Sequence, residues 1–187
     1  FDHSVFDADE SDYARVIEAI KNLNEGTNLE EYFDTDQILR YIAANTVMVN
    51  LDSYASSMAH NYYLYESNGV VTVLPWDYNL SFAAFQVGSA SDAVNFPIDT
   101  PVSGISLSER PLFYAFLSDA TYLAQYHAYL QEIITNFFDS GLFEQTIDSV
   151  YEQIAPYVQE DATAFYSYEE FEEAVSMLKT YGLLRAE

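Results

Sequence analysis

The stretch His60–Phe82 reads HNYYLYESNGVVTVLPWDYNLSF. Two runs rich in aromatic and β-branched residues, NYYLY and VVTVL, lie on either side of Asn68-Gly69. An Asn-Gly pair between such runs is the strongest short-range signal for a β-hairpin, because both residues readily adopt the positive φ angles of a tight turn. We therefore expect a hairpin here, and the chain leaves it directly through Trp76, the only tryptophan, into Asp77.

The rest of the chain has mostly helical periodicity. Apolar residues at spacings of three and four predict helices from about Ser11 to Gly26 and from a cap at Thr35 to about residue 50. The segment 81–109, rich in Gly, Pro and Asp, is expected to be a long ordered loop. Further helices are predicted over 111–119, 120–141, 143–158 and 167–182, the last opened by a capping box. The fold class is therefore mainly α (α+β), with one embedded β-hairpin.

Composition narrows the possible functions. The chain has 187 residues, of which 50% are hydrophobic, so it can bury the core of a single domain, 1–187. A net charge of -24 with only six cationic residues argues against nucleic acid and anionic membranes, and it favours basic partners or divalent metals. The 17 tyrosines and 13 phenylalanines argue against disorder. No apolar run approaches the roughly 20 residues of a membrane span, and the absence of cysteine excludes disulfides.

Three polar residues occur in an order that suggests chemistry. Asp52 follows a predicted helix, Asn61 opens the hairpin and Asp77 closes it. Protein kinases arrange a catalytic Asp, a metal-binding Asn and a metal-binding Asp in this order around a hairpin. Mg²⁺ requires such oxygen ligands, and a carboxylate can take the proton of an attacking hydroxyl. The pattern alone also fits a solvated Asp and a turn-forming Asn.

Longer sequence motifs add to this pattern. The stretch NLDSYASSMAHNYYLYESNGVVTVLPWDYNLSF resembles the spore coat protein H (CotH) kinase family, with its HNYYLY-type strand and LPWDYN-type motif. The resemblance continues through AVNFPIDTPVSG, RPL and GLLRAE, and so covers nearly the whole chain. It implies a kinase-like fold that uses ATP and Mg²⁺ or Mn²⁺ to phosphorylate serines of coat or extracellular proteins. It also implies an extracytoplasmic location: spore coat, secreted or cell-surface.

The resemblance assigns a role to each motif residue. Asp77 of PWDYN corresponds to the metal-binding Asp of a kinase, and Asn61 of HNYYLY to the second metal ligand. Asp52 of NLDSY becomes the catalytic Asp. Trp76 and Asn79 flank the metal site and are expected to contact the cofactor. The acidic composition favours a basic, Ser/Lys-rich acceptor protein.

Two departures from ordinary kinases qualify these roles. The interval from Asp52 to Asn61 is nine residues, whereas ordinary kinases have five. In addition, Lys21 and Lys179 both lie in helical patterns, and the six glycines form no Gly-rich loop, so we expect that the lysine-bearing lobe is not part of this sequence. We therefore expect this chain, which begins at Phe1, to be the C-lobe portion of a kinase domain and to be inactive as a fragment.

Two other functions fit the same residues. The first is a non-catalytic structural or adhesion module in a spore coat or cell-surface protein, which keeps the fold without turnover. The second is a polysaccharide hydrolase that uses Asp52 and Asp77 as a carboxylate pair, about 5 to 10 Å apart across a sugar-sized cleft.

A few further residues could be functional. His60 is a candidate for lining the site, whereas His127 is expected to be a packed or surface histidine in a helix. Arg110 is expected either to contact phosphate or substrate, or to anchor the preceding loop through an ion pair with a carboxylate.

The acidic start of the chain resembles part of a calcium-binding loop. Asp7, Asp9, Ser11 and Glu18 match positions 1, 3, 5 and 12 of an EF-hand, but Asp12 replaces the required glycine. A solvated acidic lead-in to a helix is therefore the preferred interpretation.

Overall fold

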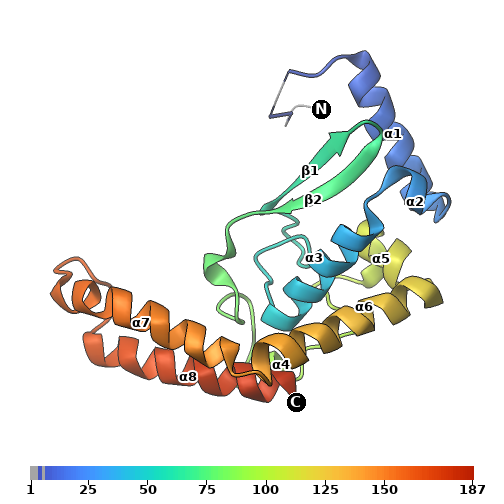
Figure 1. The fold of residues 1–187 in the computed structure, drawn as a ribbon. Helices are drawn as coiled ribbons and strands as arrows, with labels where there is room; N and C mark the ends of the chain where they lie inside the picture. The colour runs from blue at the N-terminus through green and yellow to red at the C-terminus, as the bar shows by residue number, and fades with distance from the viewer. Residues whose placement is uncertain (1–3, 6) are drawn as a thin grey trace.

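The first helix has the capping expected from its sequence. A computed structural model describes residues 4–5 and 7–187, and in it α1 spans Glu10–Glu25 (Figure 1). The Asp9 carboxylate accepts hydrogen bonds from the backbone N–H groups of Ser11 and Asp12, at 2.8 and 3.0 Å. Helix α1 ends at Gly26 in a left-handed conformation, with φ of 65°. Asp9 therefore caps a helix, which confirms the helical interpretation of this acidic segment.

Helix α3 forms the centre of the molecule. The short α2 (Leu29–Tyr32) leads into α3 (Thr35–Met48), and Ile38 and Ile42 of α3 are fully buried. The cap of α3 is Asp34, whose carboxylate accepts a hydrogen bond from the backbone of Gln37 at 3.1 Å, rather than the predicted Thr35. Both residue types cap helices well, so the sequence cannot decide between the two neighbours.

The predicted hairpin is present and packs on α3. Strands β1 (Tyr62–Ser67) and β2 (Val70–Pro75) are antiparallel, with Leu64 opposite Val73. Val73 is fully buried. Gln37 of α3 holds the strand backbone, because its side chain both donates to Val73 O, at 2.5 Å, and accepts from Val73 N, at 3.0 Å. The hairpin is thereby fixed to the central helix.

The long segment after the hairpin is ordered, as predicted, and contains only short helices. These are the 3₁₀ turn η1 (Tyr78–Leu80), helix α4 (Ala90–Val94) and the 3₁₀ turn η2 (Leu107–Glu109). Backbone hydrogen bonds tie its start to the end of α3, from Phe82 N to Met48 O at 2.7 Å and from Ala83 N to Val49 O at 3.3 Å.

Helices α5 and α6 complete the core. Helix α5 (Pro111–Leu117) begins at the predicted proline and buries Phe113 and Phe116 completely. Helix α6 (Ala120–Ile133) packs along α3 and continues into a π-helical turn, η3 (Ile134–Phe138). The sequence predicts one uninterrupted helix up to Gly141, so the π turn is a difference from the expectation.

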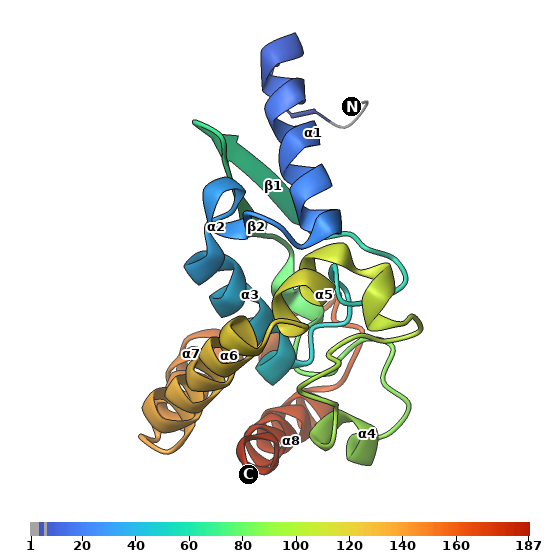
Figure 2. The ribbon, with the colours of Figure 1, turned by 90° about the vertical axis from the view of Figure 1, so that its right-hand side faces the viewer.

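The last two helices form an antiparallel pair, which we call the arm. Helices α7 (Leu142–Glu160) and α8 (Tyr168–Ala186) lie side by side and project away from the rest of the molecule in Figure 1, whereas Figure 2 views the pair nearly end-on. Ser167 and Glu170 form the predicted capping box at the start of α8. Tyr151 and Phe171 stack between the two helices with ring centroids 5.7 Å apart. The architecture is thus mainly α with one embedded hairpin, as predicted.

Candidate functional site

Asp52 lies in a buried segment that follows α3. Val49 ends the helix in a left-handed conformation, and Asn50 N then donates to Asn45 O at 3.1 Å. The Ser53 hydroxyl donates to Asn50 O at 2.7 Å, which closes a tight turn around Asp52. Asp52 itself is only 7% exposed. A carboxylate at this depth needs partners, because burial without hydrogen bonds is costly.

Asn61 supplies one of these partners. Its Nδ2 donates to the backbone oxygen of Asp52 at 2.9 Å and to Asp52 Oδ2 at 3.0 Å. Asn61 has a φ of 58°, a left-handed conformation that asparagine tolerates better than most residues. Its side-chain oxygen accepts no hydrogen bond from the residues described. The structure thus brings Asp52 and Asn61 together despite the interval of nine positions.

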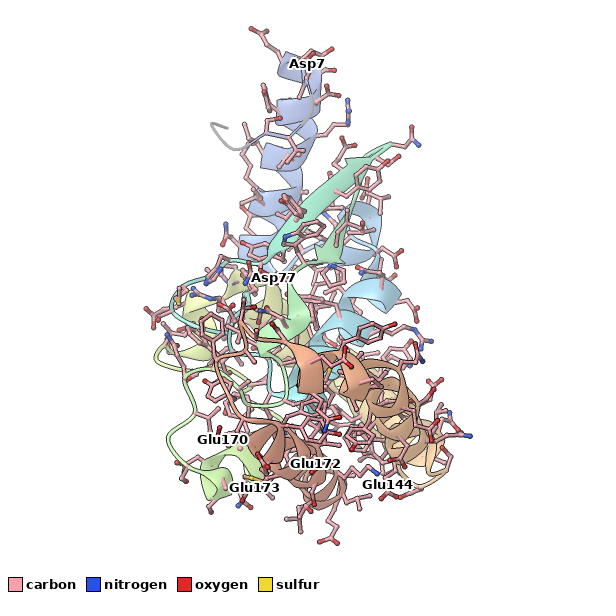
Figure 3. All side chains as sticks on the ribbon, turned by 90° about the vertical axis from the view of Figure 1, so that its left-hand side faces the viewer. Asp7, Asp77, Glu144, Glu170, Glu172 and Glu173 are labelled. Carbon is pink, nitrogen blue, oxygen red and sulfur yellow. The ribbon has the colours of Figure 1, made fainter. Side chains whose placement is uncertain are left out.

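Asp77 lies at the same end of the hairpin. Trp76 N donates to Asn61 O at 3.2 Å, so the strand pairing continues to the residue before Asp77. Asp77 also has a left-handed backbone, with φ of 55°, and its side chain is exposed. Figure 3 shows it at the base of the hairpin. Its carboxylate makes no hydrogen bond or ion pair with any described residue, so both oxygens are available to a ligand.

His60 is the second partner of Asp52. Its Nε2 lies 3.0 Å from Asp52 Oδ1, in an orientation that suits an ion pair of the protonated ring but not a directed hydrogen bond. The His60 side chain is 38% exposed. Asp52 therefore contacts one neutral amide and one ring that can carry a positive charge, and His60 does line the candidate site.

Arg110 positions the Asp52 segment, in a way that the sequence did not reveal. Its Nε donates to Tyr54 O at 2.7 Å and to Ser56 O at 3.1 Å, and a terminal nitrogen also donates to Ser56 O. The guanidinium lies over the Tyr54 ring, 5.4 Å from its centroid. The expected ion pair with a carboxylate is not what anchors this arginine. It binds backbone carbonyls instead, which no residue pattern could have indicated.

An open cavity of about 490 Å³ borders Asp77 on the side of α3. It is lined by Gln37, Arg40, Tyr41, Ala44 and the segment 75–78. Trp76 is 59% exposed and packs edge-on against Tyr63, with ring centroids 5.8 Å apart. Asn79 is exposed in η1 and does not line the cavity. Asp52 does not line it either, so this cavity is not a cleft shared by the two carboxylates.

The remaining candidates lie outside this site. His127 is a surface histidine, as expected, and its Nε2 lies 2.7 Å from Asp99 Oδ1. Within the described part of the chain, no three His, Cys, Asp or Glu side chains gather as a metal cluster. A site made of Asp77 and Asn61 would offer one carboxylate and one amide oxygen. These are hard oxygen donors, which suit Mg²⁺ or Mn²⁺ when phosphate oxygens complete the shell.

The fold and the site together define a class: a mainly helical protein with a carboxylate–amide site at the open end of a β-hairpin. Comparison with known families agrees with the motifs. The profile of the family described as CotH kinase protein matches residues 3–187. The chain therefore belongs to the CotH kinase family. No curated protein matches it. None of the helices in the described part is long and apolar enough to cross a membrane.

Proposed function

We propose that this chain carries the phosphoryl-transfer site of a protein kinase that uses ATP and modifies Ser or Thr. The main support is the position of Asn61. Its side chain donates hydrogen bonds to Asp52, and its backbone oxygen accepts one from Trp76, the residue before Asp77. One hairpin end therefore connects the carboxylate that we propose as the acceptor-activating group with the two oxygens that we propose as metal ligands. This proposal rests also on membership of the CotH kinase family.

In the proposed reaction, Asp52 orients the acceptor hydroxyl and takes its proton as the hydroxyl oxygen bonds to the γ-phosphorus of ATP. The bond from the γ-phosphorus to the bridging oxygen breaks, and ADP leaves. Asp77 and Asn61 would hold Mg²⁺ or Mn²⁺, which neutralises charge on the phosphates. Asp52 is held rigidly for this role, since Asn61 and His60 contact its two oxygens. Trp76 and Asn79 would flank the nucleotide.

Asp77 provides the sharpest test. The protein at its natural length, with ATP, Mn²⁺ or Mg²⁺ and a Ser-rich basic acceptor, should lose at least about a hundredfold in transfer rate in Asp77→Ala. Asp139→Ala removes an exposed carboxylate at the end of η3 and should leave the rate unchanged. Equal rates in wild type and Asp77→Ala would refute the assignment. Wild-type protein that binds no nucleotide and transfers nothing would instead favour a structural or adhesion module.

The acceptor is proposed to be a basic, Ser/Lys-rich protein. The chain has a net charge of -24, and Figure 3 shows Glu170, Glu172 and Glu173 on the same side of the molecule as Asp77. Such a surface attracts cations and speeds their association, and salt screens this effect. Transfer to a Lys/Ser peptide should therefore fall as salt increases. A Glu/Ser peptide of equal length should be a poor acceptor at all salt concentrations; equal use of both peptides would contradict the proposal.

The family also supports an extracytoplasmic location, on a spore coat or cell surface, as a proposal. Fractionation of source cells with an antibody against the protein tests it. Recovery only with cytoplasmic markers would exclude this location.

A further inference from the structure

The six cationic residues of the chain have two kinds of partners. Four of them form ion pairs with carboxylates, and these are Arg15, Lys21, Arg40 and Lys179. Arg110 and Arg185 have no carboxylate within ion-pair distance in the described part of the chain, although the sequence has 30 acidic residues. Both bind backbone carbonyls instead. Burying a cation without a counter-ion costs free energy, so the position of these two residues needs another explanation.

Arg185 lies near the end of α8, at the root of the arm and beside α4 (Figure 1). One terminal nitrogen donates to Thr46 O at 3.1 Å, and the other donates to Val94 O at 3.0 Å. Thr46 stands in the last turn of α3, which has no basic residue of its own, and Val94 ends α4. The C-terminal end of a helix carries partial negative charge, so a cation is favourable there. Arg185 supplies that cation from α8, and it joins α3, α4 and α8 at one point.

The end of α3 holds both acidic segments of the candidate site. Asp52 follows the last residue of α3 after three positions. The segment after Asp77 returns to the same helix end, where Phe82 N donates to Met48 O at 2.7 Å. The arm contacts this returning segment as well, since the ring of Phe143 packs against Phe82 with centroids 5.9 Å apart. A shift of the end of α3 relative to the arm would therefore move both acidic segments.

We propose that Arg185 is a positioning residue for the candidate site: by fixing the end of α3 to the arm, it sets the place of the Asp52 segment and of the Asp77 turn. Arg110 binds carbonyls after Asp52, and Arg185 binds one before it. The two cations without a counter-ion thus hold the main chain on both sides of this carboxylate. The proposal concerns the backbone of the two acidic segments, and it holds whether or not the protein transfers phosphate.

Hydrogen exchange of single backbone amides, measured by NMR on the full chain, tests this role. The reporter amides are those of Asn50, Phe82 and Ala83, whose hydrogen bonds close the end of α3 and attach the segment after Asp77 to it. Arg185→Ala should accelerate exchange of the reporter amides by about tenfold or more, because the end of α3 loses its charged hydrogen bond to the arm.

Two control variants separate positioning from a general loss of stability. Lys179→Ala removes another cation of α8, but Lys179 pairs with Asp148 of α7 inside the arm, so the reporter amides should exchange at the wild-type rate. Asn22→Leu destabilises the protein from α1, where the buried Asn22 side chain bonds to Glu18 O and to Thr27. It should accelerate the slowly exchanging amides of the whole chain alike, without singling out the reporter amides.

Two results for Arg185→Ala overturn the proposal. If exchange accelerates only in α4 and α8, Arg185 fastens the arm and does not position the site. If all slowly exchanging amides accelerate by the same factor, as expected for Asn22→Leu, the effect is general instability. Should Arg185→Ala fail to fold, Arg185→Lys replaces it, because lysine keeps the charge but lacks the planar fork that reaches two carbonyls. The reporter amides should then exchange faster than in wild type, and wild-type rates would overturn the proposal.

Discussion

Replacement of Arg110 by alanine should loosen the segment that carries Asp52. Arg110 comes from the end of the long loop, just before α5, yet its guanidinium donates to the carbonyls of Tyr54 and Ser56. It also donates to its neighbour Glu109 O, at 2.8 Å. Alanine removes all of these donors and uncovers one face of the Tyr54 ring. The carbonyl oxygens of Tyr54 and Ser56 then need new hydrogen-bond partners.

The size of the effect can be worked out from these contacts. Hydrogen bonds to a charged donor contribute about 1.5 to 3 kcal/mol each, but bonds from one side chain are not additive. Since two carbonyls lose their partner, we expect a loss of about 3 kcal/mol in the free energy of unfolding. For a chain of this length that corresponds to about 6 to 12 °C in melting temperature.

Urea or thermal unfolding, followed by circular dichroism, measures the change. Arg40→Ala is the matched control, because Arg40 is 52% exposed and pairs at the surface with Asp36 and Glu132. Such pairs contribute about 0 to 1 kcal/mol. Arg110→Lys should be intermediate, since an ammonium group lacks the planar fork that reaches two carbonyls. If Arg110→Ala is no more destabilising than Arg40→Ala, Arg110 does not position the Asp52 segment.

Two further predictions concern the arm and the hairpin. A methyl group at Gly182 would lie 2.1 Å from Cε1 of the buried Phe143 ring. Gly182→Ala should therefore lower the free energy of unfolding in urea by about 1 to 2 kcal/mol, although alanine has the better helix propensity. The loss should be smaller in a Phe143→Leu background, and an equal loss in both backgrounds would contradict the clash. Hydrogen bonds from Arg15 hold the pKa of Glu66 below its usual value of 4.5. This pair therefore stabilises the protein above that pH and stops doing so as the pH falls through the lowered pKa. Unfolding curves should show Glu66→Gln less stable than wild type at pH 7, with the difference vanishing in acid; a constant difference would contradict the ion pair.

The sequence predicted those parts of the fold that local chemistry determines. Asn68-Gly69 marked the hairpin turn, Gly26 the end of α1 and Pro111 the start of α5, and each has its expected place. The π turn at 134–138 was not predictable, because it differs from an α-helix only in a hydrogen-bond register that is one residue longer, and no residue type in this segment marks that change. Local signals thus located the elements but not irregularities inside them.

The site was predictable as a set of residue types but not as a set of contacts. The order of Asp52, Asn61 and Asp77 in the sequence placed them around one hairpin, and the structure does bring Asn61 onto Asp52. The role of Arg110 was not predictable, since its acceptors are backbone carbonyls 54 and 56 positions away, and any residue type could provide them. The contact of Arg185 with the end of α3 was equally hidden, because its acceptor is a backbone carbonyl 139 positions away.

The two acidic residues of the site differ in how they are held, and this difference follows from their neighbours. Asp52 is buried, with Asn61 and His60 at its oxygens and Arg110 on the backbone just after it. Asp77 is exposed, and its side chain has no partner in the described part of the chain. A group that orients an acceptor must keep one geometry, whereas a metal ligand must be open to an ion that arrives with nucleotide. The fixed carboxylate therefore suits the proposed base, and the open one suits the proposed metal ligand. If the two roles were exchanged, Asp52 would have to bind the metal ion, although its carboxylate is buried and already contacts Asn61 and His60.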